Sequence, residues 1–300
     1  MINKIEQNIF RILPPSRGIR FTNCLKLTTK KPISPNFIYY FCSMKQQITI
    51  VKVGGKIVEN PDTLNQLLHD FSALPGKKVL VHGGGRTATD MASRLGIETH
   101  MVEGRRITDA DMLRVVTMVY AGLVNKNVVA RLQGCGVNAL GLTGADMDVI
   151  RSHRRPLKNG IDYGFVGDVD RVDSERLSML VEAGITPVMA PLTHNGQGEM
   201  LNTNADTIAA ETAKALANHY DVTLVYCFEH AGVLTNPDDE ESVIPLITRE
   251  KFELLKADGT VSGGMLPKIE NSLAAVEAGV KRVVITKADK IGTHQGTSIE

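Results

Sequence analysis

Two glycine-rich turns are the first places in this sequence where a ligand could bind. Gly54–Gly55 follows the β-branched run Ile48–Val53, and Gly83–Gly85 follows a second run, Lys78–Val81, after one intervening residue, His82. In an open parallel sheet, ligands gather beyond the carboxyl ends of the strands, where glycines expose backbone N–H groups and allow close approach. One such pair is usually only a tight turn. Two clusters at successive strand ends favour a site for a phosphate or a carboxylate.

Two lysines could bring positive charge to that site. Lys52 lies between Val51 and Val53, and lysine is rare in an apolar strand because burying an ammonium group without a partner is costly. The alternative is a side chain that faces outward from the strand. Lys268 follows the pair Gly263–Gly264 and opens a helical run, which again places a cation beside a glycine loop. By itself the second lysine is a weak signal.

A polar helix start supplies further candidates. Asn202, Asn204 and Asp206 fall within five residues at the beginning of the predicted helix Ala205–His219. Asn and Asp often cap helices, but three polar side chains are more than capping needs. We therefore expect Asn202 to hydrogen-bond a polar ligand and Asp206 to hold lysines in position.

Arg106 and His82 complete the set of residues that could take part in chemistry. Arg106 follows Gly104, and a guanidinium at a glycine-marked loop suits bidentate binding of a carboxylate, although a surface arginine would fit there as well. The eight histidines form no HExxH or other metal-ligand spacing. His82 is expected to pack or hydrogen-bond beside its glycine loop, with no role in proton transfer.

Several classes of protein are excluded by what the sequence lacks. It holds no GxxxxGK[ST], no GxGxxG and no protein-kinase signature, so the common nucleotide-binding folds lack their motifs. Four scattered cysteines without a CxxC exclude a disulfide scaffold and a zinc site, and they indicate a reducing compartment. The longest apolar runs have the length of strands, well short of the roughly 18 residues of a membrane helix. We expect a cytoplasmic location.

The elements that must position these residues alternate between short β-branched runs and longer helical ones, which is typical of a mainly parallel sheet with crossover helices. The predicted strands are Ile48–Val53, Lys78–Val81, Asn138–Leu142, Thr186–Ala190, Thr223–Cys227 and Arg282–Thr286. The predicted helices are Asp62–Ala73, Thr87–Leu95, Asp109–Gln133, Ser174–Ala183, Ala205–His219 and Met265–Ala278. A hairpin is expected within Asn159–Asp168 at the edge of the sheet. The turn-rich His194–Gly198 suggests a divide near residue 200, between lobes 44–200 and 201–300.

Composition describes an ordinary globular protein with an unusual beginning. The 300 residues are 43% hydrophobic and 22% charged, and the net charge of +1 gives no case for nucleic acid or membrane surfaces. Residues 1–43, however, carry a net charge of +6, which leaves −5 for the rest. Three interpretations stay open: translation that begins at Met44, a transit peptide for organelle import, and an oligomerising helix with Ile5, Ile9 and Ile12 on one face.

Together these motifs resemble the amino-acid kinase family, and within it the members that act on N-acetylglutamate. No single motif is decisive, but the ordered set is specific, and it spans about residues 48–270. The set comprises Lys52-Val-Gly54-Gly55, Val81-His82-Gly83-Gly84-Gly85, Gly104-Arg-Arg106-Ile-Thr108, Gly141-Leu-Thr-Gly144-Ala-Asp, Phe165-Val-Gly167-Asp-Val, Asn202-Thr-Asn204-Ala-Asp206 and Gly263-Gly264-Met265-Leu-Pro-Lys268.

The resemblance implies an open three-layer α/β/α sandwich around a mostly parallel sheet. The N-terminal lobe would bind the acylated amino acid and the C-terminal lobe would bind ATP with its Mg²⁺. The implied reaction is transfer of the γ-phosphoryl group of ATP to the side-chain carboxylate of N-acetyl-L-glutamate, as a step of arginine biosynthesis. Members of the family are typically homodimers.

The same resemblance implies a role for each candidate residue. The catalytic residues would be Lys52 and Lys268, which stabilise the phosphoryl group in transit, and Asp206, which orients both lysines. Arg106 would bind the α-carboxylate of the substrate, and Asn202 would anchor its acylamino end. Backbone N–H groups would cradle the reacting groups at four glycines, namely Gly54, Gly55, Gly84 and Gly85.

Two segments depart from the family pattern. Glu229 stands where relatives usually carry an aspartate, with an unusual His230 beside it, so nucleotide handling is the least transferable property. The ending after Thr286 is shorter than that of arginine-inhibited relatives, which argues against feedback inhibition by arginine. The motifs do not distinguish an acetyl from a succinyl group.

Two rival functions stay open beside this one. The first is another carboxylate kinase of the same fold, and the second is a non-catalytic relative that senses an amino acid or a nucleotide. Retention of Lys52, Lys268 and Asp206 argues against the sensor, because a sensor needs no clamp for a transition state.

Overall fold

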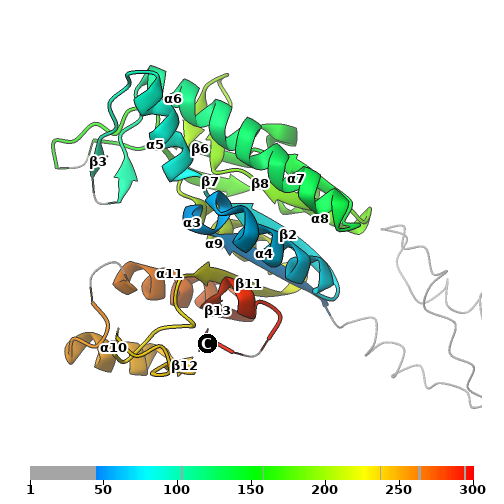
Figure 1. Cartoon of the computed structure of the whole chain (residues 1–300), viewed down its shortest axis with the longest axis vertical. Coiled ribbons are helices and arrows are strands. Elements are labelled where there is room, and N and C mark those ends of the chain that lie inside the picture. The colour runs from blue at the N-terminus through cyan, green and yellow to red at the C-terminus, as the bar shows by residue number, and fades with distance from the viewer. Residues whose placement is uncertain (1–44, 103, 158, 237, 263–264, 294) are drawn as a thin grey trace, which may run out of the picture. The chain divides into compact units, whose positions relative to one another are not determined.

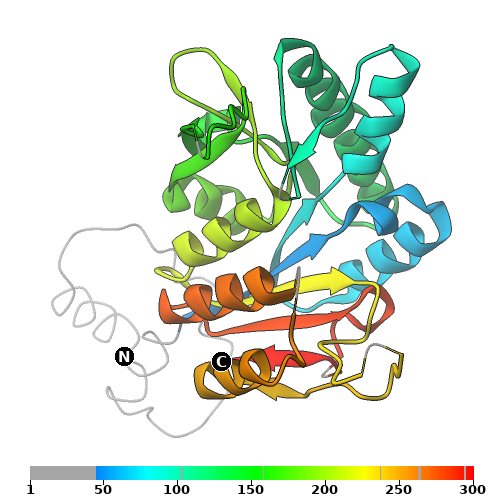
Figure 2. The ribbon, with the colours of Figure 1, turned by 90° about the vertical axis from the view of Figure 1, so that its left-hand side faces the viewer.

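An eight-stranded sheet forms the centre of the structure, with the strand order β12-β14-β13-β11-β1-β2-β8-β5 (Figure 1). The computed structural model describes residues 45–300 apart from 103, 158, 237, 263–264 and 294. All neighbouring strands of this sheet pair in parallel except β13 and β14. Helices cover both faces, as Figure 2 shows, so the predicted open three-layer sandwich is confirmed.

The strands of the central sheet are β1 (Gln46–Val53), β2 (Lys77–His82), β5 (Ala139–Leu142), β8 (Thr186–Met189), β11 (Tyr220–Phe228), β12 (Leu246–Ile247), β13 (Arg282–Lys287) and β14 (Thr297–Ile299). The helices are α3 (Gly55–Glu59), α4 (Pro61–Ala73), α5 (Gly85–Arg94), α6 (Ala110–Val116), η2 (Thr117–Val124), α7 (Asn125–Gly134), η3 (Asp146–Asp148), α8 (Ser174–Glu182), α9 (Ala205–Leu216), α10 (Arg249–Ala257), α11 (Met265–Glu277) and η4 (Ala288–Lys290). All six predicted strands are present within a few residues, and five of the six predicted helices are single helices. Helices α3 and α10 and strands β12 and β14 are additions that periodicity did not reveal.

The alternation of side chains along β1 decides which helices Lys52 meets. Ile48 and Ile50 belong to the apolar core that contains residues of α8, α9, α10 and α11, whereas Val51 and Val53 belong to the core formed with α3, α4 and α7. Successive residues of a strand point to opposite faces, so Lys52 shares the face of Ile48 and Ile50. That face is the one covered by α9 and α11.

The carboxyl ends of the central strands lie at one edge of the sheet because the strands are parallel. Strands β1, β2, β8 and β11 end at Val53, His82, Met189 and Phe228. The connections that follow carry both glycine clusters, Pro191 and Glu229. The fold therefore gathers at this edge segments that are far apart in the sequence.

A second sheet carries the polar segment before α9. It contains β6 (Ile150–Arg154), β7 (Gly167–Val172), β9 (Leu192–His194) and β10 (Met200–Asn202) in the order β10-β9-β6-β7. The predicted hairpin within Asn159–Asp168 is wrong in position. Its strands are β6, which ends before this segment, and β7, which begins inside it at Gly167, and both belong to the second sheet. Gly160 and Gly164 lie in the connection between them.

The long helix predicted over Asp109–Gln133 is interrupted in its middle. It consists of α6, the π-helical segment η2 and α7, which follow one another without a gap. π-helical turns are rare and frequently mark functional sites. Periodicity could not reveal this interruption, because η2 is apolar on almost every side.

Three further predictions are not tested by the described residues. The interpretations of residues 1–43 and the placement of Gly263–Gly264 lie outside them. One sheet contains strands from both halves of the chain, and the division into lobes at residue 200 stays a prediction. Among the described residues, no helix is long and apolar enough to cross a membrane.

Candidate functional site

The two predicted glycine clusters lie against each other. The backbone N–H of Gly83 donates to the carbonyl oxygen of Val53 at 2.9 Å, which joins the ends of β1 and β2. A Cβ atom added to Gly55 would lie 3.7 Å from the backbone nitrogen of Gly85 and 3.9 Å from that of Gly84. These are ordinary contact distances, whereas a Cβ atom added to Gly83 would lie only 3.2 Å from the backbone nitrogen of Gly55, so the packing of the two loops favours glycine at position 83.

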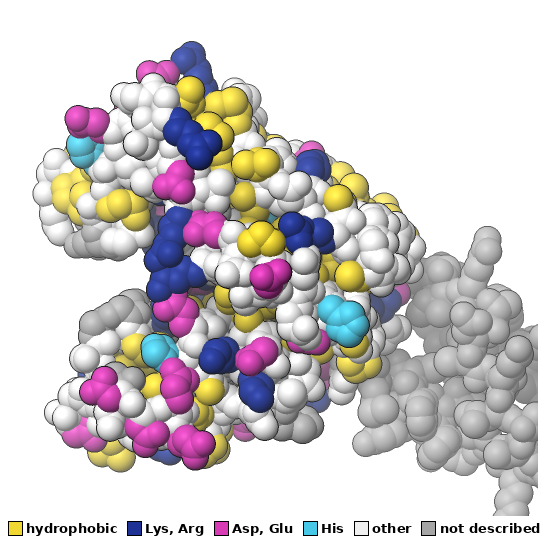
Figure 3. All heavy atoms as spheres, in the orientation of Figure 1, with side chains coloured by type: hydrophobic (Ala, Val, Ile, Leu, Met, Phe, Trp, Pro, Cys, Tyr) yellow, Lys and Arg dark blue, Asp and Glu magenta, His cyan; other side chains and the backbone are white. Residues whose placement is uncertain are grey.

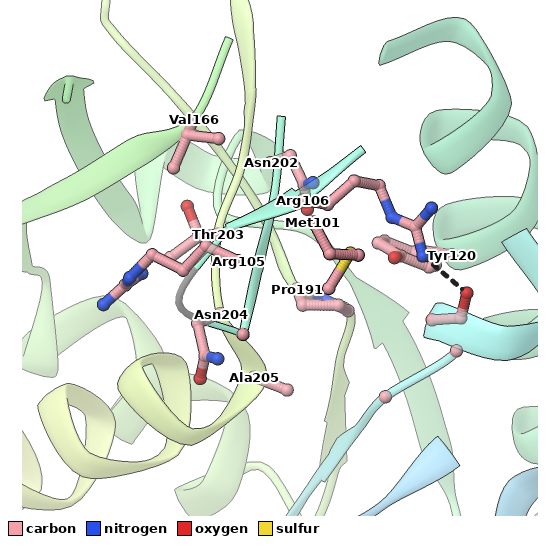
Figure 4. Close-up of a pocket in the computed structure, with 14 residues that line it drawn as sticks. Met101, Arg105, Arg106, Tyr120, Val166, Pro191, Asn202, Thr203, Asn204 and Ala205 are labelled. Atoms are coloured by element: carbon pink, nitrogen blue, oxygen red, sulfur yellow. Dashed lines mark hydrogen bonds between the residues drawn. The ribbon is translucent and has the colours of Figure 1, made fainter. Parts of the chain in front are cut away.

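The glycine loop after β2 is the beginning of a helix. Gly84 is the N-cap of α5, and Asn204 is the N-cap of α9, where its side chain accepts from the backbone N–H groups of Asp206 and Thr207. A helix N-terminus presents unpaired N–H groups and a partial positive charge, so it favours anions. Both helices begin at the same pocket, which Figure 4 shows in close-up.

This pocket has a volume of about 180 Å³ and contains four of the predicted site residues. These are Gly84, Gly85, Arg106 and Asn202. The other lining residues are Gly83, Met101, Gly104, Arg105, Tyr120, Val166, Pro191, Thr203, Asn204 and Ala205. Arg106 comes from β4 (Arg105–Arg106), which pairs with β3 (Met101–Val102) in a small hairpin.

Arg106 is almost completely buried and its guanidinium is held from several sides. Nη2 donates to the carbonyl oxygen of Gly85 at 2.8 Å (Figure 4). It also donates to Oγ1 of Thr89 at 2.8 Å, and Nη1 donates to Oγ1 of Thr99 at 3.2 Å. No carboxylate among these partners neutralises the guanidinium. A fixed cation of this kind suits recognition of an anionic ligand group.

Tyr120 from the π-helical segment lies beside this guanidinium. Burial raises the pKa of the Tyr120 hydroxyl, and the positive charge of Arg106 opposes that shift. A Cβ atom on Gly84 would lie 3.0 Å from the Tyr120 ring, which is tighter than most such contacts, so any larger residue would have to displace the ring. Tyr120 is a pocket residue that sequence reasoning missed, because it is one apolar position within an apolar run.

Asn202 is connected to the same hairpin through Thr108. The side-chain amide of Asn202 donates to Oγ1 of Thr108 at 2.9 Å, and that hydroxyl donates to the carbonyl oxygen of Arg106 at 3.0 Å. The backbone N–H of Asn202 donates to the carbonyl oxygen of Phe165 at 2.8 Å, and Phe165 lies in the connection between β6 and β7. Asn202 is therefore fixed at the pocket wall before any ligand arrives.

Lys52 and Asp206 form a buried ion pair. Lys52 is 8% exposed, and its Nζ lies 2.6 Å from Oδ1 of Asp206 in the first turn of α9. This contact explains how the sheet tolerates a lysine in an apolar strand, since a buried charge needs a partner. The outward-facing alternative for Lys52 is wrong.

Lys268 lies on the same side of the sheet, in the first turn of α11. Its Nζ is 3.8 Å from the centre of the Phe228 ring, and Lys52 Nζ is 5.7 Å from the same centre. Burial lowers the pKa of Lys268, the charge of Asp206 raises it, and the charge of Lys52 lowers it further. The structure thus brings Lys52, Lys268 and Asp206 together, as the sequence predicted, although among the described residues Asp206 forms an ion pair with Lys52 and not with Lys268.

The loop after β11, which departs from the family pattern at Glu229 and His230, also places charged side chains at this edge of the sheet. Glu229 forms a short ion pair with Lys56 of α3, and this hydrogen bond is the largest cause of the lowered pKa of Glu229. His230 pairs with Glu240 at 2.6 Å instead of facing the lysines. Figure 3 shows Lys and Arg side chains gathered in a hollow of this face, with acidic side chains around them.

His82 supports the glycine loop from below and is fully buried. Its Nδ1 donates to the carbonyl oxygen of Gly83 at 2.7 Å, and its Nε2 accepts from the Asn125 side chain at 3.1 Å. Burial lowers the pKa of His82 to about 4. The prediction that His82 hydrogen-bonds beside its loop is confirmed.

Comparisons with known proteins show the family of the chain. Residues 47–287 match the model of the Amino acid kinase family. The chain is 65% identical over 257 residues to the acetylglutamate kinase of Bacteroides fragilis, which covers 86% of this chain and 98% of that protein.

Solved structures show the same fold. The protein smu.665 from Streptococcus mutans UA159 superposes with a TM-score of 0.68 at 30% identity, over 84% of this chain and 98% of the other. The N-acetylglutamate synthase from Neisseria gonorrhoeae, solved with coenzyme A and N-acetyl-glutamate, superposes with a TM-score of 0.72 at 25% identity, over 87% of this chain and 61% of the other.

The buried His82 predicts a pH dependence of stability. The folded-state pKa is about 4 and the ordinary value is 6.5. As the pH falls from 6.5 to 4, the His82 ring becomes protonated in the unfolded chain but stays neutral in the folded chain. The contribution of His82 to the unfolding free energy is therefore complete above pH 6.5 and falls by up to about 3 kcal/mol on acidification.

Denaturant unfolding at pH 7 and pH 5 measures this contribution. The drop in unfolding free energy should be smaller in His82→Gln than in the unchanged chain, and His69→Gln, which alters an exposed histidine, should leave the drop unchanged. An NMR titration in which the His82 ring ionises near pH 6.5 in the folded protein would contradict the prediction.

Proposed function

The chain belongs to the amino acid kinase family, and from this premise we propose how its site works. We propose that it transfers the γ-phosphoryl group of ATP to the side-chain carboxylate of N-acetyl-L-glutamate, or of a related N-acyl-glutamate, in arginine biosynthesis. The product is an acyl phosphate. The observation that carries the proposal is the buried pair of Lys52 and Asp206, with Lys268 beside it, next to a pocket that holds the Arg106 guanidinium.

The chemistry of this reaction requires what the site contains. A carboxylate is already ionised at neutral pH, so it needs no general base to become a nucleophile. Its attack on a polyphosphate brings several negative charges together, and catalysis therefore depends on positioning and on neutralising charge. Two ammonium groups and two helix N-termini at one edge of the sheet supply positive charge without a proton-transfer residue.

The candidate residues divide this work between them. We assign Lys52 and Lys268 to the transferred phosphoryl group, and Asp206 to holding the lysines. The backbone N–H groups of Gly54, Gly55, Gly84 and Gly85 would contact the reacting oxygens. In the pocket, Arg106 would bind the α-carboxylate, and Asn202 would hydrogen-bond the acylamino group.

ATP would bring Mg²⁺ with its phosphates. The residues fit this arrangement, because the carboxylates nearest the two lysines, Asp206 and Glu229, are engaged by Lys52 and Lys56. Mg²⁺ is usually held by substrate phosphates with one or two carboxylates rather than by a dedicated protein cage. When bound, it would neutralise charge on the phosphates. We assign ATP to the lobe from residue 201 onward and the acyl amino acid to residues 44–200, with Asn202 reaching it from just beyond the divide. We assign the enzyme to the cytoplasm.

We also propose a homodimer, in which a second copy covers an apolar face near the free edge of the sheet. Met118 and Leu123 of η2 and Leu140 of β5 are exposed. Strand β5 is the last strand of the sheet, and α7, which continues η2, packs beside it, where Lys126 Nζ donates to the carbonyl oxygen of Gly141 at 3.1 Å. An exposed edge strand beside apolar side chains is normally covered.

The activity is tested by ATP-dependent formation of acyl hydroxamate from N-acetyl-glutamate, N-succinyl-glutamate, glutamate and aspartate in parallel. We expect product from an N-acyl-glutamate, and we expect Lys52→Ala and Lys268→Ala to lower kcat by at least about 100-fold through lost stabilisation of the transition state. The matched control is Lys281→Ala, which removes an exposed lysine that pairs with Asp221.

Three results would contradict this assignment. Near-normal turnover by both lysine variants would show that Lys52 and Lys268 do not stabilise the transferred phosphoryl group. Product from glutamate or aspartate alone would favour another carboxylate kinase, and no product from any acceptor would favour a sensor.

Arg106→Ala should raise KM for the acyl amino acid with a smaller effect on kcat, because the guanidinium contacts the α-carboxylate in ground state and transition state alike. We expect a rise of at least about tenfold, typical of a lost charge-assisted hydrogen bond. Steady-state kinetics with varied acyl amino acid measures it, with Arg114→Ala, an exposed arginine paired with Asp111, as the control. If KM rises for ATP instead, Arg106 contacts the nucleotide, and its assignment to the acyl amino acid is wrong.

Met118→Glu should convert the dimer to a monomer, because a carboxylate would be buried at the proposed interface without a partner. Sedimentation velocity distinguishes the two states. Met179→Glu alters an equally exposed methionine on α8 and should leave the dimer intact. A monomeric unchanged chain, or a dimer that tolerates Met118→Glu, would overturn the proposed interface.

A further inference from the structure

We propose that Phe228 is a positioning residue for the lysine clamp, whose ring face holds the Lys268 ammonium in place for phosphoryl transfer. The inference rests on the proposed function, since it assigns to a neutral side chain the task of orienting a catalytic cation. It adds to the site the last residue of β11, which directly precedes the loop where Glu229 and His230 depart from the family pattern.

The distances favour a cation–π contact. Lys268 Nζ lies 3.8 Å from the centre of the Phe228 ring, and Lys52 Nζ lies 5.7 Å from it. An ammonium within about 6 Å of an aromatic centroid, over the ring face, is attracted by the ring quadrupole. Both lysines of the proposed clamp fall within this range of one ring.

The ring orients the Lys268 ammonium without neutralising its positive charge. Of the carboxylates in the described part of the chain, none lies within 4.0 Å of Lys268 Nζ, although Asp206 pairs with Lys52. A lysine ammonium has three N–H donors and no acceptor. A carboxylate partner would occupy these donors and repel a phosphoryl group, whereas a ring face orients the ammonium and leaves donors for phosphate oxygens.

The ring is itself fixed by the fold. Tyr226 and Phe228 are alternate residues of β11, so they share a face of the sheet, and their rings stack with centroids 6.1 Å apart at 24°. Tyr226 is buried, lies beside Lys52 in the strand register, and its hydroxyl is 3.4 Å from the carbonyl oxygen of Asp206. Two aromatic residues of one strand therefore support all three members of the clamp.

The charges around Lys268 make such an attraction useful. Burial lowers the pKa of this lysine, Asp206 from α9 raises it, Lys52 from β1 lowers it, and Glu229 from the loop after β11 raises it. Burial and a neighbouring ammonium both disfavour the charged form. A ring that attracts the ammonium counteracts them, so Lys268 stays positive and close to Lys52 despite their mutual repulsion.

The test replaces Phe228 in the full chain with 4-fluoro-, 3,5-difluoro- and 3,4,5-trifluorophenylalanine. Each fluorine weakens the quadrupole while the ring keeps its shape. We expect kcat in the hydroxamate assay to fall stepwise, by about tenfold at the trifluoro ring, with KM for the acyl amino acid changed by less than about twofold. The same series at Phe252, a buried ring of α10 near Lys256, is the control and should leave kcat unchanged.

A second readout does not depend on turnover. The reactivity of Lys268 with acetic anhydride, followed against pH by mass spectrometry in the free protein, reports its titration. Because the ring favours the ammonium form, the pKa of Lys268 should fall along the series.

A Lys268 titration that is flat along the series at Phe228, or a kcat that falls equally in both series, would overturn the proposal. If the unchanged chain forms no acyl phosphate from any acceptor, the proposed function fails, and the titration alone decides whether Phe228 holds Lys268.

Discussion

The ion pair between Lys52 and Asp206 is the interaction on which the rest of the site depends. It joins the central strand of the sheet to the first turn of α9, with Lys52 buried and Asp206 partly exposed. Removing one partner of a fully buried pair typically costs about 3–5 kcal/mol, because the other charge is left buried and alone, and the cost is smaller here because Asp206 reaches solvent. A core built only for stability would place an apolar residue here, so the pair is better explained by a requirement for positive charge at this edge.

That requirement organises the surrounding elements. Parallel strands bring both glycine loops to the same edge, alternation along β1 directs Lys52 toward α9 and α11, and the centre of the Phe228 ring of β11 lies within 5.7 Å of both ammonium groups. On the pocket side, the β3–β4 hairpin and β10 bring Arg106 and Asn202 together through Thr108. The positive charge is thus created locally by a few side chains and helix ends, within a chain whose net charge is only +1.

Much of this arrangement could be predicted from the sequence, since strand alternation and glycine clusters are local signals. The six parallel strands are of this kind, whereas the full grouping of Lys52, Lys268 and Asp206 was implied by the resemblance of the ordered motifs to the family. Tyr120 and the π-helical segment could not be predicted, because an apolar run does not reveal its helical pitch. The hairpin was misplaced because its strands are partly polar, and the importance of Phe228 depends on a tertiary contact with Lys268 from another part of the chain.

The central claim is that two lysines from different elements act on one phosphoryl group. A crystal structure of the full chain with N-acetyl-glutamate, MgADP and aluminium fluoride tests it most directly, because the fluoride complex stands in for the phosphoryl group in transit. The account predicts Nζ of Lys52 and Nζ of Lys268 within hydrogen-bond distance of the fluoride atoms, beside the N–H groups of the two glycine loops. A fluoride complex bound away from either lysine would contradict it.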